Sequence, residues 1–251
     1  GRIVTYRLYP ISMGELKDFS TRYEIVTQLE ERLIFGSYPE IFSRESLGSK
    51  AQYLKDLLDE YLFKDILDFS GIRNATKIRD LLKLLAFQIG SQVSLSELGT
   101  SLGMSKETVA RYIDLLEKSY VLFTLRGFSR NLRKEVSKMP KIYFYDLGVR
   151  NAVIGNLNFL KDREDAGKLW ENFLISERMK KMEYSQELYS HYFWRLTSGA
   201  EMDLVEDRGG KLYGFEFKYS TKTAKDPKSW PTAYPGSSFD TINKDNYLDF
   251  A

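Results

Sequence analysis

The pattern of apolar and polar positions divides the chain into a helical first part and a strand-rich last part. Apolar residues recur at helical spacing over residues 21–35, 51–69 and 76–88, which predicts three helices, the first ending at Gly36. Such stripes pack into a core more often than they bind a partner, although both uses remain open. Residues 168–181 predict one more helix, and strands are expected over residues 120–125, 141–146 and 189–196, with one further strand within residues 237–250. Prolines 227, 231 and 235 favour a loop before that last strand.

Residues 93–125 carry the pattern of two helices joined by a tight turn. Ser94 and Ser105 are at positions typical of helix caps, and Gly103 separates the two apolar periodicities. Together with the strands on either side of residues 126–140, this order predicts a winged helix-turn-helix. Winged helices bind DNA or dock other proteins, and both uses stay open for this segment.

The segment between the two wing strands is strongly basic. It suits contacts with phosphate groups, because its basic residues outnumber a single acidic residue and the segment also contains an aromatic side chain. The second helix is less basic, since Glu107, Asp114 and Glu117 offset its cations. The candidate DNA-binding residues are Lys106, Arg111, Arg126, Arg130, Arg133, Lys134 and Lys138, and Lys141 ends the same basic run.

The stretch GAEMDLVEDRGGKLYGFEFKYS, residues 199–220, predicts a β-hairpin whose loop is Gly209-Gly210. In that register Asp203 faces Glu216 and Glu201 faces Lys218. Two carboxylates at roughly 5 Å across a ladder destabilise the strand pair. A divalent cation between them would remove that repulsion, because Mg²⁺ prefers carboxylate oxygens. The alternative is a solvated face on which Lys218 neutralises an acidic neighbour.

The pattern D-x12-E-x-K formed by Asp203, Glu216 and Lys218 resembles the PD-(D/E)XK nuclease superfamily, although no proline precedes Asp203. The resemblance implies that Asp203 and Glu216 hold Mg²⁺ or Mn²⁺ and that Lys218 polarises the attacking water or the phosphate. It also implies a further acidic ligand from an upstream helix, and Glu171 is in the matching place. Catalytic Glu171, Asp203, Glu216 and Lys218 are therefore the candidate site.

Composition narrows the chemistry further. The 251 residues include 37 Lys and Arg against 35 Asp and Glu, so any nucleic-acid binding must come from local patches. There is no cysteine and one histidine, His191, which disfavours disulfides, zinc sites and a Ser-His-Asp triad. No apolar run approaches the 18 residues of a membrane span, so a cytoplasmic protein without membrane contact is expected.

Several motifs resemble the C-terminal part of a family of bacterial and archaeal AAA-type ATPases whose last domain is related to PD-(D/E)XK nucleases. They are LYPISMGEL, GSYPEIF, KIYFYDLGVRNAVI and the hairpin GAEMDLV…GFEFK. The resemblance implies an ATPase domain upstream, with oligomerisation through it. The chain contains no G-x4-G-K-[ST] loop, so ATP is a ligand of the full-length protein only and the fragment alone is not expected to be an ATPase. Arg2 occupies the place of an arginine finger, although an ordinary arginine at a strand start explains it equally well.

These observations predict a multi-module α+β protein. Residues 1–72 would be the end of an ATPase domain with its helical lid, residues 73–145 a winged helix-turn-helix, and residues 146–251 a restriction-endonuclease-like α/β domain with a mixed sheet. The expected function is DNA binding with a metal-dependent, nuclease-like site, which would make the chain a Mg²⁺-dependent deoxyribonuclease. Two alternatives stay open: a catalytically inactive nuclease-like interaction module, and a regulatory ATPase fragment that does not act on DNA.

Overall fold

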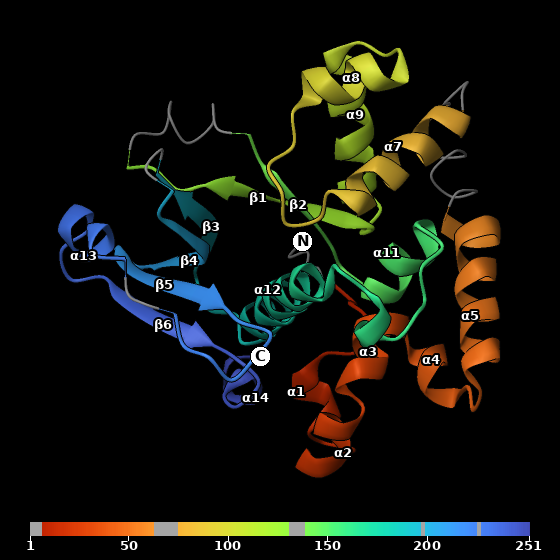
Figure 1. Ribbon diagram of the computed structural model, residues 1–251, viewed down its shortest axis with the longest axis horizontal. Helices are drawn as coiled ribbons and strands as arrows, with labels where there is room; N and C mark the ends of the chain where they lie inside the picture. Colours follow the sequence, from red (N-terminus) through yellow and green to blue (C-terminus); the bar gives the residue numbers. More distant parts are fainter. Residues whose placement is uncertain (1–6, 63–74, 131–138, 197–198, 225–226) are drawn as a thin grey trace, which may run out of the picture.

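The structure is a computed structural model that describes residues 7–62, 75–130, 139–196, 199–224 and 227–251. One long helix lies in its centre, between a six-stranded sheet and a group of helices (Figure 1). The sheet is mixed and the architecture is α+β, as the sequence predicts. The helical part comes first along the chain and most of the sheet comes last.

The first part of the chain folds into short helices. They are α1 (Met13–Leu16), α2 (Arg22–Thr27), α3 (Leu29–Phe35), α4 (Pro39–Ser43), α5 (Leu47–Asp56) and the π-helical η1 (Leu57–Leu62). The single helix expected over residues 21–35 is wrong, because Gln28 adopts φ −87° and ψ 0° and separates α2 from α3. Gly36 ends α3 with φ 77°, as predicted. Of the helix predicted over residues 51–69, the last seven residues lie outside the described part.

The middle of the chain contains α7 (Ala75–Phe87), α8 (Leu95–Leu102) and α9 (Lys106–Lys118), followed by β1 (Leu122–Gly127) and β2 (Lys141–Phe144). The side chains of Ser94 and Ser105 cap α8 and α9 as predicted, each accepting a backbone N–H three residues on. Gly103 ends α8 in the left-handed conformation, which orients α9 for packing on β1. Strands β1 and β2 pair antiparallel.

The last part begins with helices and continues with strands. Its elements are α11 (Leu147–Val153), η2 (Leu160–Asp162), α12 (Ala166–Tyr184), β3 (Ser190–Arg195), β4 (Glu201–Arg208), β5 (Lys211–Phe217), α13 (Ser229–Ala233), β6 (Ser238–Ile242) and α14 (Tyr247–Phe250). The loop expected around the prolines contains the short helix α13. Pro231 is tolerated there because it occupies the first turn, where a backbone N–H has no partner within the helix.

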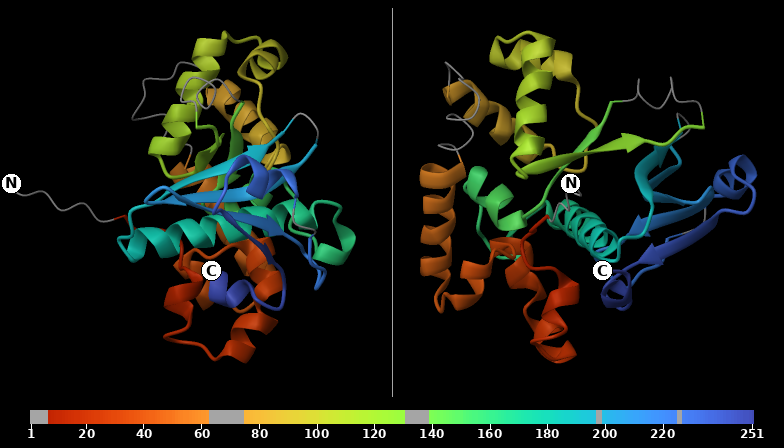
Figure 2. Two further views of the ribbon diagram at one scale, coloured as in Figure 1. Left: turned by 90° about the vertical axis from the view of Figure 1, so that its left-hand side faces the viewer. Right: turned by 180° about the vertical axis from the view of Figure 1, so that it is seen from behind.

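The sheet has the strand order β2-β1-β3-β4-β5-β6. Parallel pairing joins β1 to β3 and β5 to β6, and the other neighbours run antiparallel. Figure 2 shows α12 lying along one face of this sheet. Because β1 pairs with β3, one sheet continues across the predicted boundary between residues 73–145 and residues 146–251.

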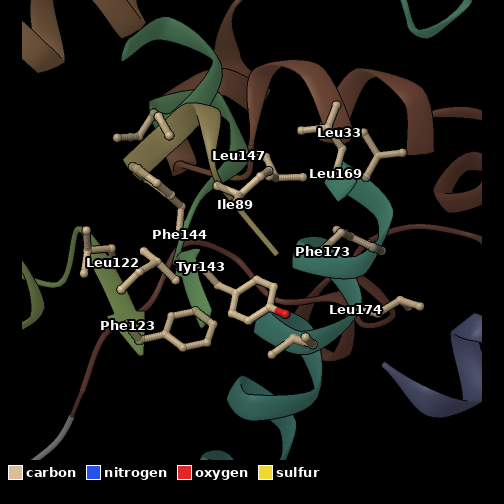
Figure 3. Packing of buried hydrophobic residues seen from close by; sticks show 14 of the residues in the cluster. Leu33, Ile89, Leu122, Phe123, Tyr143, Phe144, Leu147, Leu169, Phe173 and Leu174 are labelled. Atoms are coloured by element: carbon tan, nitrogen blue, oxygen red, sulfur yellow. The ribbon is translucent and has the colours of Figure 1, made fainter. Parts of the chain in front are cut away.

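The main hydrophobic core lies where α12 meets the sheet and the preceding helices. Figure 3 shows Phe173 and Leu174 of α12 close to Tyr143 of β2, with Leu33 and Leu147 nearby. The opposite face of the sheet carries a smaller cluster that includes three buried aromatic side chains. Its buried members are Phe128, Trp194, Met202, Val205, Leu212 and Trp230. Among the described residues, no helix combines the length and apolar character needed to cross a bilayer.

A close backbone contact joins the end of α3 to the start of α11. A Cβ atom on Gly148 would lie 2.0 Å from the carbonyl oxygen of Phe35, so only glycine fits at this position. The Asp146 carboxylate caps α11 by accepting the Val149 N–H at 3.0 Å, and it also accepts the Ser37 N–H at 2.7 Å. Asp146 is therefore a structural residue of this junction.

Replacing Gly148 with alanine should destabilise the protein, because the added methyl group must push α11 away from α3. We expect the free energy of unfolding to fall by about 3 kcal/mol or more, as for an overpacked core. Gly167, in the first turn of α12, is a matched control, since a Cβ atom there meets nothing within 4 Å. Gly167→Ala should be neutral or stabilising by up to about 1 kcal/mol. Urea unfolding measures both, and a Gly148→Ala variant as stable as wild type would contradict the contact.

Candidate carboxylate site

The predicted hairpin is present with the predicted loop. Gly209 and Gly210 have φ values of 61° and 87°, the combination that a type I′ turn requires. Arg208 pairs with Lys211, and the ladder continues from there to the pair Leu204–Phe215. Phe215 and Phe217 face the main core as expected, which leaves Glu216 and Lys218 on the other side of β5.

The pairs that are present follow the predicted register, but the ladder ends before the predicted pairs of Asp203 and Glu201, where β4 contains a bulge. Tyr192 pairs with Val205 and Trp194 with Met202, so β4 has one residue more than β3 in this interval. The β4–β5 ladder stops at Leu204, and Asp203 is not a ladder partner of Glu216. The same holds for Glu201, which lies 3.7 Å from Arg195 rather than opposite Lys218. Bulges often redirect side chains beside functional sites.

Asp203 lies in the bulged part of β4, and its carboxylate reaches β5. Asp203 Oδ2 accepts the backbone N–H of Phe217 at 2.8 Å, and the residue is 9% exposed. Burial raises the pKa of Asp203 well above its ordinary value, and the nearby negative charges of Glu171 and Glu216 raise it further. Lys141 and the Phe217 N–H oppose that rise. The sequence-predicted carboxylates of three different elements thus act on one another.

Glu171 approaches this site from α12 and is held by two residues of β2. Its Oε1 atom accepts a hydrogen bond from Tyr143 Oη at 2.5 Å and forms an ion pair with Lys141 Nζ at 3.1 Å. Gly90 makes room for the other oxygen, since a Cβ atom there would lie 3.1 Å from Glu171 Oε2. Glu171 therefore has a defined position beside β2.

Lys141 is a buried cation among these carboxylates. Burial acts to lower its pKa, but the charges of Glu171 and Asp203 and the hydrogen bond with Glu171 outweigh burial, so the pKa is raised. Its ammonium group also lies 5.4 Å from the centre of the Phe193 ring. Lys141 was expected in the basic wing, and that assignment is wrong because the side chain points into the carboxylate site.

Lys218, the first residue after β5, pairs with Glu216 of that strand. Its Nζ lies 2.7 Å from Glu216 Oε1, and its side chain is 40% exposed. Burial acts to lower the pKa of Lys218, whereas the hydrogen bond and charge of Glu216 raise it and prevail. The lysine is thus charged and reachable from solvent, as a group that contacts a phosphate must be.

The donor set suits a hard cation in kind, because Glu171, Asp203 and Glu216 offer carboxylate oxygens and repel one another around Asp203. The spacing of these carboxylates does not suit a cation equally well. Within the described ranges, no three His, Cys, Asp or Glu residues are close enough together to hold a metal ion. Lys141 and Lys218 already neutralise two of the three carboxylates. A cation held here would require these carboxylates to lie closer together than they do.

The residues that the sequence interpretation missed are Lys141, Tyr143 and Gly90. The first two alternate along β2, so a strand over residues 141–146 already implied that they share one face. Nothing local indicated that this face meets α12. The bulge in β4 was equally hidden, because it appears only in the pairing with β3.

The predicted DNA-binding residues are described only in part. Lys106 and Arg111 are exposed on α9, and Arg126 and Arg130 are exposed at and after the end of β1. The other predicted residues, Arg133, Lys134 and Lys138, together with the candidate arginine finger Arg2, lie outside the described residues.

Two family models match the chain. A domain of unknown function, DUF8612, matches residues 26–159, which is more than half of the sequence. The chain belongs to the DUF8612 family. A second domain of unknown function, DUF4143, matches residues 166–241 and so contains α12 and the whole hairpin. The four candidate site residues Glu171, Asp203, Glu216 and Lys218 therefore lie in the DUF4143 region, and Lys141 and Tyr143 lie in the DUF8612 region.

Curated relatives are uncharacterized proteins. One from Mycobacterium tuberculosis is 28% identical over 211 residues, which cover 83% of this chain and 47% of the relative. One from Methanocaldococcus jannaschii is 25% identical over 197 residues, covering 72% of this chain and 43% of the relative. The chain thus spans about half the length of the curated relatives it matches. No solved structure gives a significant match.

Replacing Asp203 with asparagine should stabilise the protein increasingly as the pH rises. A carboxyl group with a raised pKa in the folded state binds more protons there than in the unfolded chain, so its contribution to stability falls as pH rises from its ordinary pKa to the raised value. Asp203→Asn removes this loss, and Asn retains an oxygen for the Phe217 N–H. We expect a gain of about 1 kcal/mol at pH 7 and a smaller one at pH 4.

Urea unfolding between pH 4 and pH 8 measures this difference. Asp240→Asn, a substitution of an exposed carboxylate on β6, is the matched control. A gain for Asp203→Asn that is the same at every pH, or a loss that grows with pH, would contradict the assignment of Asp203 as a buried, repelled carboxylate.

Proposed function

We propose that this chain is the DNA-handling C-terminal portion of an AAA-type ATPase, and that Glu171, Asp203, Glu216 and Lys218 form a metal-dependent, nuclease-like site on it. The observation that carries the proposal is the Asp203 carboxylate, which is buried beside two other carboxylates although burial and repulsion both disfavour its charge. Such clustering is typical of functional sites. A buried cluster of carboxylates lowers the stability of the folded protein, so a purely structural role does not explain it.

The order of elements supports a nuclease-like domain. Helix α12 precedes the meander β3-β4-β5, and α13 then leads to β6, which is parallel to β5. In the same way, α7, α8 and α9 followed by β1 and β2 suit a winged helix. The first helices would be the ATPase lid. The length of the relatives, together with the co-occurrence of DUF4143 with AAA ATPases, supports an ATPase domain elsewhere in the whole protein, where ATP and Arg2 would act.

The residues present allow a definite division of roles. A Mg²⁺ or Mn²⁺ ion would supply activation of water and neutralisation of phosphate charge. Asp203 and Glu216 would hold it, and because the pKa of Asp203 is raised, its affinity for a cation would fall as the pH is lowered. Lys218 would donate a hydrogen bond to the phosphate or to the water, because its side chain is the most exposed of the group. Tyr143 and Lys141 would position Glu171.

A second candidate function is an inactive nuclease-like module that only binds a partner. The ion pairs Lys141–Glu171 and Lys218–Glu216 favour it, since they neutralise two carboxylates without any metal. The two candidates differ in one measurable property, which is the affinity of the site for divalent cations.

Millimolar Mn²⁺ should raise the melting temperature of the wild-type protein, because a ligand that binds only the folded state stabilises it. The rise corresponds to about 1–3 kcal/mol for a cation present at ten to a hundred times its dissociation constant. Asp203→Asn should lose this rise, and it should also lose cleavage of supercoiled DNA. Differential scanning calorimetry and a plasmid-nicking assay measure the two effects.

Asp207→Asn is the control, because Asp207 lies on the same strand but accepts the N–H of Gly210 in the turn. A wild-type protein whose melting temperature ignores Mn²⁺ and that leaves DNA intact would refute the metal-dependent site and favour the inactive module.

The wing is tested by its dependence on salt. Neutralising Arg130, Arg133 and Lys134 together should weaken duplex binding and reduce the slope of log affinity against log salt by roughly three, about one for each lost phosphate contact. The control is a variant in which the exposed residues Lys55, Lys83 and Lys161 are neutralised, because it removes the same charge outside the wing. Fluorescence anisotropy from 50 to 200 mM salt gives both slopes. An unchanged slope would exclude the wing, and a wild-type protein that binds no DNA would favour an ATPase fragment that does not act on DNA.

A further inference from the structure

A small cavity of about 210 Å³ lies at the tip of the β4–β5 hairpin, away from the carboxylate site. Three segments enclose it: Arg130 after β1, residues 210–212 at the hairpin turn, and residues 234–237 before β6. These segments belong to distant parts of the sequence, and the pairing of β1 with β3 and of β5 with β6 brings them together (Figure 1).

Two cations line the cavity, and each is placed against an aromatic ring. The Arg130 guanidinium lies 5.4 Å from the centre of the Tyr234 ring, and Lys211 Nζ lies 5.1 Å from that of Tyr213. Among the described residues, neither cation has an ion-pair partner within 4.0 Å. The nearby Asp207 carboxylate accepts the Gly210 N–H at 2.8 Å. The cavity therefore has two positive groups that no described carboxylate neutralises.

An unsatisfied hydroxyl group adds a second, independent signal. The Oγ atom of Ser237 is buried and has no hydrogen-bond partner in the described part of the chain. Buried polar atoms are nearly always paired, and leaving one unpaired costs about 1–3 kcal/mol. Ser237 also lines the cavity. A ligand with several acceptor oxygens would satisfy Ser237, Arg130 and Lys211 together.

We propose that this cavity binds a phosphate group, and that the group is a phosphodiester of a nucleic-acid backbone. A phosphate carries the negative charge that the two cations attract and the oxygens that the hydroxyl needs. The rings restrict both cations, so little side-chain freedom is lost on binding. The assignment to nucleic acid rests on the proposed DNA-handling function. The phosphate chemistry rests on the cavity alone.

The position of the cavity fits an anchor for DNA bound at the carboxylate site. It lies seven residues along β4 and its turn from Asp203, a separation of roughly 20 Å along the hairpin. A phosphate held here would fix the orientation of a duplex without reading its sequence. Arg130 of the predicted wing would thus share its contact with Lys211 of the hairpin.

The first experiment tests the phosphate chemistry with inorganic phosphate. Amide resonances of residues 210–212 and 236–237 should shift on titration of the wild-type protein, and the shifts should weaken several-fold in Ser237→Ala and in Lys211→Gln. Both variants should fold, because the Ser237 hydroxyl makes no hydrogen bond and Lys211 makes no ion pair within the described residues. Lys161→Gln, which removes one exposed charge on η2, should behave as wild type. Equal shifts in all the proteins, or none at these amides, would overturn the proposal.

The second experiment uses a labelled DNA duplex and distinguishes the source of the phosphate. Lys211→Gln should weaken binding about tenfold, as expected for a lost charge-assisted hydrogen bond, and should lower the salt slope by about 0.9. Wild-type DNA affinity and slope in Lys211→Gln and Ser237→Ala would overturn the nucleic-acid assignment. If wild type binds phosphate at these amides and binds no DNA, then the proposed function fails, whereas the phosphate site stands and its ligand is free phosphate.

Discussion

The contact on which the rest of the structure depends is the buried Asp146 carboxylate between the start of α11 and the residues after α3. Its two oxygens accept the N–H groups of Ser37 and Val149, which are 112 residues apart along the chain. Asn151, one turn further, donates to the carbonyls of Leu33 and Ile34. Helix ends leave such backbone groups without partners. These side chains satisfy the end of one helix and the start of another, so α3 and α11 form a single rigid support.

Helix α12 transmits this support to the sheet. The Asn172 amide accepts the Phe144 N–H and donates to the Phe144 carbonyl, each at 2.8 Å, and so acts like a neighbouring strand at the edge of β2. Glu171, one residue earlier, is then carried directly to Lys141 and Tyr143. The position of Glu171 therefore follows from how α12 docks on β2. The burial of the carboxylate site therefore depends on how α12 packs against β2, and not on the hairpin alone.

Local signals made part of this predictable. Caps such as Ser94 and Ser105, the Gly209-Gly210 loop and the alternation along β5 act over a few residues, and each is present as expected. Long-range packing decided the rest. Asp203 could be named as a candidate, but its bulge depends on pairing between β3 and β4, and the role of Lys141 depends on α12. A basic residue after a basic run looks like a surface residue until its strand is known to be buried.

The division of the site between two segments has a physical consequence. Lys141 and Tyr143 lie on a strand that follows the predicted wing, whereas Asp203 and Glu216 lie on the hairpin, and the shared sheet fixes their distance. Without β2, Glu171 would lose both of its hydrogen-bond donors while remaining close to Asp203. Repulsion between those carboxylates would then be opposed by less positive charge. Part of the positive charge beside these carboxylates thus comes from Lys141 of β2, a strand outside the hairpin, so the site depends on the sheet that β2 and the hairpin share.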